Sequence, residues 1–159
     1  MKFGTIRENG ENIVVIQAND ECTCRLNDVI EFTNNNISNS ILELIQIEDF
    51  EKNIIPIIKK NIVHAEKLDQ STLDWLPPLP NPSKILGVAF NNKELMKKAH
   101  QDPGVPKFFL KPPSSLQGHN KPIIVDPDWG AVIPEPEICA VISRKAKHVL
   151  ESNALKYVF

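Results

Sequence analysis

The chain has 159 residues and a net charge of −2, with acidic and basic residues mixed along its length. This length allows one domain of ordinary size or two small ones, and the lack of a basic stripe argues against nucleic-acid binding. No apolar run approaches the ~18 residues of a membrane-spanning helix, and the start of the chain turns polar too soon for a signal peptide. We therefore expect a cytoplasmic protein that does not associate with membranes.

The first third of the chain begins with apolar runs typical of short strands. Such runs lie at 3–6, 13–16 and 28–32. Asn9-Gly10, between the first two runs, is a pair that favours a hairpin turn. We expect three strands, the first two joined as a hairpin.

Two helices are predicted after these strands. Ser40 and Glu43 have the spacing of a capping box, and Ile41, Leu44 and Ile45 would share one apolar face. The isoleucines between 54 and 62 predict the second helix, with Pro56 in its first turn because proline is poorly tolerated further inside. These apolar faces are expected to form core.

A proline-rich stretch divides the chain. Residues 76–82 contain four prolines, which makes the segment stiff, extended and poor in hydrogen-bond donors. We interpret 76–83 as a joint between an N-terminal module of residues 1–75 and a second unit of residues 84–159. A polyproline ligand for an SH3-type domain is the alternative interpretation.

The second unit is expected to contain further strands and two short helices. Apolar runs predict strands at 84–90, 108–110, 122–125 and 138–142, a polar helix is predicted from Asn91 to Ala99, and Ser152 is a candidate N-cap for a helix at 154–158. Cys139, within the last apolar run, is expected to be a small core residue. Cys22 and Cys24 lack the partners of a zinc site or a disulfide framework.

Glu135 and Glu137 are the strongest chemical signal in the sequence. They precede the apolar run at 138–142, and in an extended segment residues i and i+2 point to the same side. Two adjacent carboxylates repel each other unless a cation neutralises them, and a hard divalent cation with oxygen ligands is suited to this. A metal site is one interpretation, and a solvated acidic turn before a strand is the other.

Several segments follow one another in an order typical of a known superfamily. They are a β-rich N-terminal module, a proline-rich joint, the strand at 85–91, F-L-K-P-P-S-S-L at 109–116, E-x-E-I-C-A-V-I at 135–142 and the helix at Ser152. In these features the chain resembles the N-terminal portion of the fumarylacetoacetate hydrolase superfamily, including its 2-hydroxyhepta-2,4-diene-1,7-dioate isomerase and acylpyruvase-like members. The resemblance implies an α+β, β-rich fold, with a small N-terminal β/α module followed by an incomplete catalytic mixed β-roll.

The resemblance also implies a chemistry. Glu135 and Glu137 match the family's ligands for Mg²⁺, or for Mn²⁺ or Ca²⁺, and the substrate would be a small 2-oxo or dicarbonyl acid. Family members hydrolyse C–C bonds, decarboxylate, tautomerise or dehydrate through an enolate that the metal stabilises. Lys111 is the first catalytic candidate, meeting the substrate's carboxylate or capping strand ends. Asn91, Ser114 and Ser115 are candidate substrate-binding residues, although the serines also suit a local turn. The full-length form is expected to be a homodimer.

The sequence departs from the family pattern in two places. Leu95 and Lys98 stand where the family has a histidine and a glutamate that activate water. His100 is the nearest histidine and is a second catalytic candidate. A lone histidine in a charged helix is, however, more often a solvent-exposed residue. Hydrolysis is therefore less expected than decarboxylation or tautomerisation.

The second departure concerns the metal shell. The family's third metal ligand, an aspartate, and a further lysine would follow Phe159; Asp126 and Asp128 could contribute instead. We expect the front part of an enzyme, inactive by itself. The alternative is a non-catalytic fragment or subunit that completes its sheet with another chain.

Overall fold

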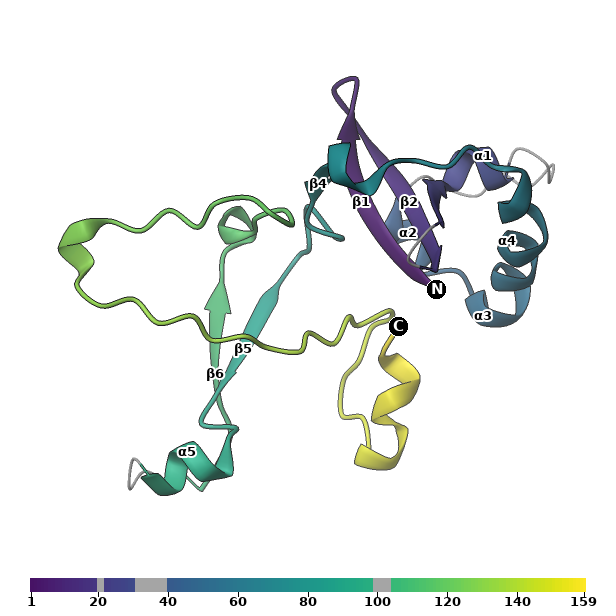
Figure 1. The fold of residues 1–159 in the computed structure, drawn as a ribbon. Coiled ribbons are helices and arrows are strands. Elements are labelled where there is room, and N and C mark those ends of the chain that lie inside the picture. The colour runs from purple at the N-terminus through teal and green to yellow at the C-terminus, as the bar shows by residue number, and fades with distance from the viewer. Residues whose placement is uncertain (20–21, 31–39, 99–103) are drawn as a thin grey trace.

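The computed structural model describes residues 1–19, 22–30, 40–98 and 104–159 and combines two antiparallel sheets with short helices, a mixed α/β architecture (Figure 1). The larger sheet contains β1 (Lys2–Glu8), β2 (Glu11–Asn19), β3 (Cys22–Arg25) and β4 (Asp74–Leu76) in the order β3-β2-β1-β4. The smaller sheet pairs β5 (Ile85–Ala89) with β6 (Lys107–Lys111). Within the described residues, no helix is long and apolar enough to cross a membrane.

The β1–β2 hairpin confirms the first two predicted strands. Asn9 and Gly10 form its turn, and their φ angles of 50° and 84° lie in the left-handed region that such a turn requires. The strands pair from Lys2 opposite Gln17 to Glu8 opposite Glu11. The turn chemistry read from the sequence therefore sets the register of the hairpin.

The third predicted strand, at 28–32, is wrong over the residues that the structure describes. The chain forms β3 at 22–25 and then turns into helix α1 (Leu26–Ile30). Leu26, Val29 and Ile30 lie at helical spacing and are all buried. The apolar run is short enough to fit the periodicity of a helix as well as that of a strand. Residues 31 and 32 lie outside the described part of the chain.

Three further helices follow, α2 (Ile41–Leu44), α3 (Phe50–Asn53) and α4 (Ile55–Asn61), and the short 3₁₀ turn η1 (Ile62–His64) extends α4. Both predicted helices are therefore present. Pro56 lies in the first turn of α4, as expected. The Ser40 side chain makes no capping hydrogen bond, so the predicted capping box is wrong although α2 begins at the predicted place.

The core lies between the larger sheet and α1–α4, which cover one of its faces (Figure 1). Every buried residue of the described chain lies between positions 5 and 62. The core cluster consists of Val14, Ile16, Cys24, Leu26, Val29, Ile30, Ile41, Leu44, Ile45, Phe50, Ile54, Ile58 and Ile62. Burial of these side chains is the main source of stability in this half.

An ion network ties β1, β3 and α1 together at the edge of the core. The Arg25 guanidinium donates to both carboxylate oxygens of Glu8, at 2.8 and 2.7 Å, and to Glu66 at 2.8 Å. Asp28, at 3.5 Å, completes the group. The hydrogen bonds from Arg25 hold the pKa of Glu8 below its ordinary value.

The proline-rich stretch leaves the larger sheet directly after β4. Residues 77–84 form no helix or strand, and the Thr5 hydroxyl donates to the carbonyl oxygen of Pro78 at 2.7 Å. We call residues 1–79 the N-terminal half and residues 84–159 the C-terminal half. The division into a module of residues 1–75 and a unit of residues 84–159, joined at 76–83, stays a prediction.

In the C-terminal half, β5, helix α5 (Lys93–Lys98) and β6 occur where the sequence predicts them. Asn92 caps the N-terminus of α5, because its side chain accepts a hydrogen bond from the backbone N–H of Glu94 at 3.0 Å. β5 is not a buried strand, since Leu86 is 60% exposed. Residue 99, the predicted end of this helix, lies outside the described residues.

The rest of the chain contains only 3₁₀ turns among its described residues: η3 (Pro113–Ser115), η4 (Pro127–Trp129) and η5 (Glu151–Tyr157). The strands predicted at 122–125 and 138–142 are wrong; only Ile142 forms an isolated bridge, to Val158. Cys139 is exposed, so the prediction of a core residue is also wrong. Ser152 lies inside η5, whose N-cap is Leu150. These apolar runs find no neighbouring strand to pair with.

Candidate metal centre

Glu135 and Glu137 lie on an exposed, extended segment. Residues 121–140 are all exposed, and their only regular element is η4. Figure 1 shows this segment as a long loop that leaves η3, turns at η4 and returns towards the C-terminus. Both carboxylates are therefore open to solvent and to ligands, on a loop rather than at the start of a strand.

The donor set at this pair suits a hard cation in type but is incomplete in number. Carboxylate oxygens are the ligands that Mg²⁺ and Ca²⁺ prefer. Within the described residues, no group of three or more His, Cys, Asp or Glu side chains gathers to hold a metal ion. Asp126 is already engaged, since its carboxylate accepts from the backbone N–H of Asp128 at 2.9 Å and caps η4. Glu135 and Glu137 can thus supply part of a coordination shell.

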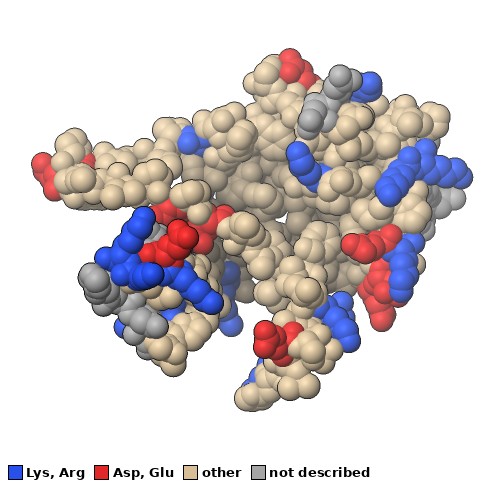
Figure 2. Space-filling view, turned by 60° about the horizontal axis from the view of Figure 1, so that its bottom comes forward, with Lys and Arg blue, Asp and Glu red and all other residues tan. Residues whose placement is uncertain are grey.

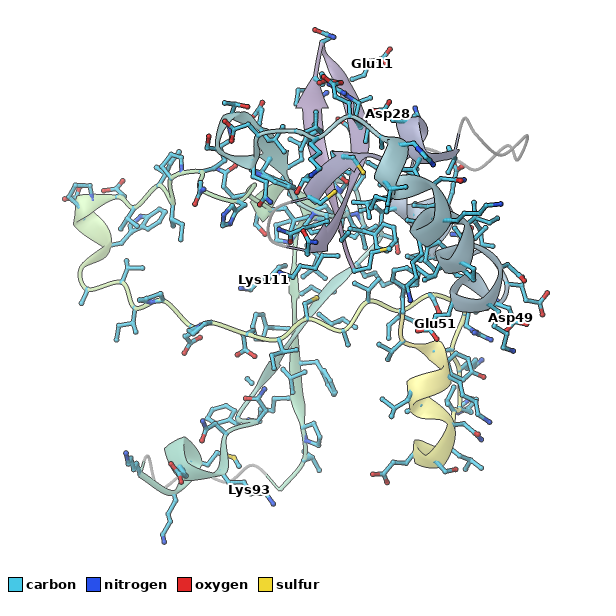
Figure 3. The ribbon with its side chains drawn as sticks, turned by 45° about the vertical axis from the view of Figure 1, so that its right-hand side comes forward. Glu11, Asp28, Asp49, Glu51, Lys93 and Lys111 are labelled. Atoms are coloured by element: carbon cyan, nitrogen blue, oxygen red, sulfur yellow. The ribbon has the colours of Figure 1, made fainter. Side chains whose placement is uncertain are left out.

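Lys111 ends β6, at the end of the hairpin nearer the larger sheet (Figure 3). It is exposed, and its ammonium nitrogen lies 5.8 Å from the centre of the Phe109 ring. The charge is therefore available to an anionic group in solvent.

Ser114 and Ser115 lie in η3, directly after Lys111 and two prolines. The Ser115 hydroxyl donates to the carbonyl oxygen of Pro112 at 2.8 Å, and its backbone N–H donates to the same oxygen at 2.9 Å. This is the local turn role that the sequence left open for the serines. Ser114 is exposed.

Asn91 lies at the opposite end of the hairpin from Lys111. Ile85 pairs with Lys111 at one end and Ala89 with Lys107 at the other; four strand steps separate these ends by ~13 Å. Asn91 borders a hollow of about 230 Å³ together with β5 and α5 residues. The structure therefore brings Lys111 and the serines together but not Asn91.

Leu95 and Lys98, the expected water-activating positions, lie on α5 at that same far end, where Figure 3 labels Lys93. Lys98 is exposed and ends α5. His100 lies outside the described residues. The substitutions of the family pair thus fall on a helix remote from Lys111.

Residues 84–159, which include every candidate site residue, match the family model described as the C-terminal domain of fumarylacetoacetate (FAA) hydrolase. Residues 84–159 of this chain belong to the fumarylacetoacetate hydrolase family. The match begins immediately after the proline-rich stretch that the sequence marked as a joint. The family assignment made from the sequence is confirmed for this part of the chain.

Several known proteins align with different parts of this chain. An uncharacterized protein of Pyrococcus abyssi is 35% identical over 78 residues, 48% of this chain and 35% of its own length. A protein of Xenopus laevis named mitochondrial oxaloacetate tautomerase is 25% identical over 159 residues, 99% of this chain and 44% of its own length. A human protein also named mitochondrial oxaloacetate tautomerase is 29% identical over 92 residues, 57% of this chain and 29% of its own length. This chain therefore spans less than half of these relatives.

Sequence reasoning missed a basic hollow in the fumarylacetoacetate hydrolase segment. It measures about 380 Å³ and is lined by Arg144, Lys147, His148, Val149, Leu150, Asn153, Lys156 and Tyr157. The run of basic residues from 144 to 148 was a visible signal for it. On the face shown in Figure 2, both acidic and basic side chains occur among neutral ones.

The three cysteines differ in their exposure. Burial raises the pKa of the Cys24 thiol to about 11, so it stays protonated and unreactive at neutral pH. Cys22 is half-buried in the same strand, and Cys139 is exposed two residues after Glu137.

Proposed function

We propose that this chain forms part of a divalent-metal-dependent enzyme that acts on a 2-oxo or dicarbonyl acid, most directly by tautomerisation. The observation that carries the proposal is the exposed pair Glu135 and Glu137 inside the segment that matches the family. A relative that aligns with 99% of the chain is named an oxaloacetate tautomerase. Oxaloacetate is a 2-oxo dicarboxylic acid, the substrate class that the sequence had suggested.

Each candidate residue has a defined part in this proposal. Glu135 and Glu137 would hold Mg²⁺, or Mn²⁺ or Ca²⁺, through their oxygens, with further oxygen donors from water or from other residues. The ion, when bound, supplies Lewis acidity towards the substrate's carbonyl group. Lys111 pairs its ammonium group with a substrate carboxylate in a charge-assisted hydrogen bond.

Tautomerisation suits the residues present better than hydrolysis. In keto–enol exchange a proton leaves the carbon beside the 2-oxo group and a proton reaches its oxygen, so the step balances without a co-reactant. No water molecule attacks a carbon atom, and no water-activating histidine and glutamate are needed. Leu95 and Lys98, which replace that pair, therefore impair this reaction less than they impair hydrolysis.

Mn²⁺ binding tests the metal site. The double variant Glu135→Ala/Glu137→Ala should weaken Mn²⁺ binding at least about tenfold, since changes to residues that merely support metal ligands already cost that much. Free Mn²⁺ can be followed by electron paramagnetic resonance. The matched control, Glu94→Ala/Glu151→Ala, removes two exposed carboxylates from the same half and should bind like the unchanged protein.

Equal Mn²⁺ affinity in the two double variants would remove the assignment of Glu135 and Glu137. Faster enol-to-keto exchange of oxaloacetate, lost in the first variant and kept in the control, would extend the assignment to the reaction. Metal binding without such acceleration would favour the second candidate below.

The second candidate is a subunit that completes its smaller sheet with another chain. The β5–β6 sheet has only two strands, so its outer edges pair with no described strand. Leu86, Phe108 and Leu110 are 60%, 64% and 70% exposed. Open strand edges beside exposed apolar side chains are suited to pairing with a further strand.

Mass in solution separates this candidate from an isolated chain. Association should be visible by light scattering at micromolar concentration, and Leu110→Lys should shift the protein towards the monomer. Glu151→Lys, an exposed position away from the sheet, is the control for added charge. A monomer at all concentrations would argue against sheet completion by a second copy.

A further inference from the structure

The segment that carries Glu135 and Glu137 has too little regular structure to hold itself in place. We call residues 122–140 the glutamate segment; all of them are exposed, and only η4 is regular. Irregular loops longer than ~12–15 residues are uncommon in compact domains and are usually functional or disordered. What holds the ends of this segment therefore decides where its carboxylates lie.

The first end is held against β4 of the N-terminal half. A Cβ at Gly118 would overlap the carbonyl oxygen of Trp75, so this close approach requires glycine. The His119 ring stands edge-on to the Trp75 ring, with centroids 6.5 Å apart. Lys121 Nζ lies 2.5 Å from the Oδ1 atom of Asp74. Steric fit, ring contact and ion pair thus coincide just before the glutamate segment.

Trp75 is itself fixed by the larger sheet. It pairs with Ile6 of β1, and its indole N–H donates to the carbonyl oxygen of Gln70 at 3.3 Å. The first attachment is therefore made to a firmly placed residue and not to another loop.

The second end is held against the core of the N-terminal half. Val141 packs against the core cluster, and its carbonyl oxygen accepts from the backbone N–H of Phe159 at 2.9 Å. The Phe159 ring contacts the Phe50 ring edge-on at 5.2 Å, and Phe50 contacts Phe3 at 5.6 Å. Figure 1 shows the end of the chain beside the N-terminus, in agreement with this contact.

We infer that the N-terminal half positions the proposed metal ligands by holding both ends of the glutamate segment, with Trp75 and Phe50 as its positioning residues. Closing the loop on two fixed points removes much of the conformational freedom that ion or substrate binding would otherwise have to remove. This inference rests on the proposed function for its chemical meaning, but its structural content can be measured separately.

Cys139 allows that measurement. It is exposed within the glutamate segment, whereas Cys24 is buried, so a nitroxide label in a Cys22→Ser background attaches at Cys139. Phe159→Ala releases the second end and Gly118→Ala displaces the first. Phe108→Ala, which removes a 64% exposed ring from β6, is the matched control.

The label should become more mobile in Phe159→Ala and in Gly118→Ala, with a narrower electron paramagnetic resonance line shape, and should be unchanged in Phe108→Ala. The same two variants, unlabelled, should bind Mn²⁺ about threefold to tenfold more weakly, while the thermal unfolding of the larger sheet stays within a few degrees of the starting protein. Lys121→Met should have a smaller effect on the line shape than Gly118→Ala.

A label that is already fully mobile in the starting protein, or whose mobility ignores both variants, would overturn the inference even if Mn²⁺ binds. If neither the starting protein nor any variant binds Mn²⁺, while the label mobility responds as expected, the proposed function is overturned and the attachment of the segment stands.

Discussion

The two halves of the chain use apolar residues in opposite ways. In the N-terminal half they lie inside, as with Ile16 and Ile58, both 0% exposed; in the C-terminal half Ile138 is 100% exposed. The difference is architectural, because helices cover a four-stranded sheet in one half, whereas the described residues of the other form a two-stranded sheet, α5, 3₁₀ turns and long loops. A two-stranded ribbon is at best marginally stable in water without further layers. Apolar composition therefore makes a core only where the topology supplies two facing layers.

Hydrogen exchange should show the largest contrast between the halves. Backbone amides in the β1–β2 ladder open mainly through global unfolding, whereas residues 122–140 have little hydrogen-bonded structure. We expect exchange at least about 10³-fold slower in β2 than in residues 122–140, since the two lie at opposite ends of the range of opening free energies. Mass spectrometry of peptides resolves the difference. Comparable protection in both regions would mean that a further layer covers the C-terminal half.

The same substitution placed in each half gives the next contrast. Ile58→Ala opens a cavity in the core and should lower the free energy of unfolding by about 3 kcal/mol. Ile138→Ala, at a fully exposed side chain, should change it by no more than about 0.5 kcal/mol. Denaturant titration measures both values. A large cost at Ile138 would contradict the exposure that we describe.

A smaller, pH-dependent effect is expected from the ion network of the N-terminal half. Arg25 lowers the pKa of Glu8 from its ordinary value of 4.5, so the stabilisation is present above that value and is lost as the pH falls through the lowered pKa. Glu8→Gln should cost about 1 kcal/mol at pH 7, because the pair is only partly shielded from water. The difference from the unchanged protein should vanish in acid.

Glu11→Gln is the matched control, since Glu11 lies opposite Glu8 in the hairpin but is exposed. Thermal unfolding between pH 3 and 7 would show the effect. A constant difference between Glu8→Gln and the starting protein across this range would contradict the role of Arg25.

The sequence predicted the N-terminal half best where local chemistry and tertiary packing agree. Asn9-Gly10 required a tight turn, and Pro56 could only occupy the first turn of its helix. The failure at 28–32 has a physical cause, because a five-residue apolar run can be buried as a strand or as one turn of helix. β3 occupies the position next to β2 at this edge of the larger sheet.

The C-terminal half was harder to predict because its apolar runs depend on distant partners. The runs at 122–125 and 138–142 have strand composition, yet a strand forms only when another strand pairs with it. The candidate site residues were chosen from motif order, and Glu135, Glu137 and Lys111 lie in the segment that matches the family. Their distances from one another were not accessible, since spacing along the chain does not encode how a hairpin separates Lys111 from Asn91.

The lysines at both ends of β6 have a further consequence. Lys107 and Lys111 flank Phe108, Phe109 and Leu110, and their ammonium groups lie over the rings of Phe90 and Phe109 at 5.7 and 5.8 Å. Charges that flank an exposed apolar strand act as gatekeepers against amyloid-like stacking, because each added copy would bring like charges together. Replacing these two lysines should therefore make aggregation through β6 more favourable.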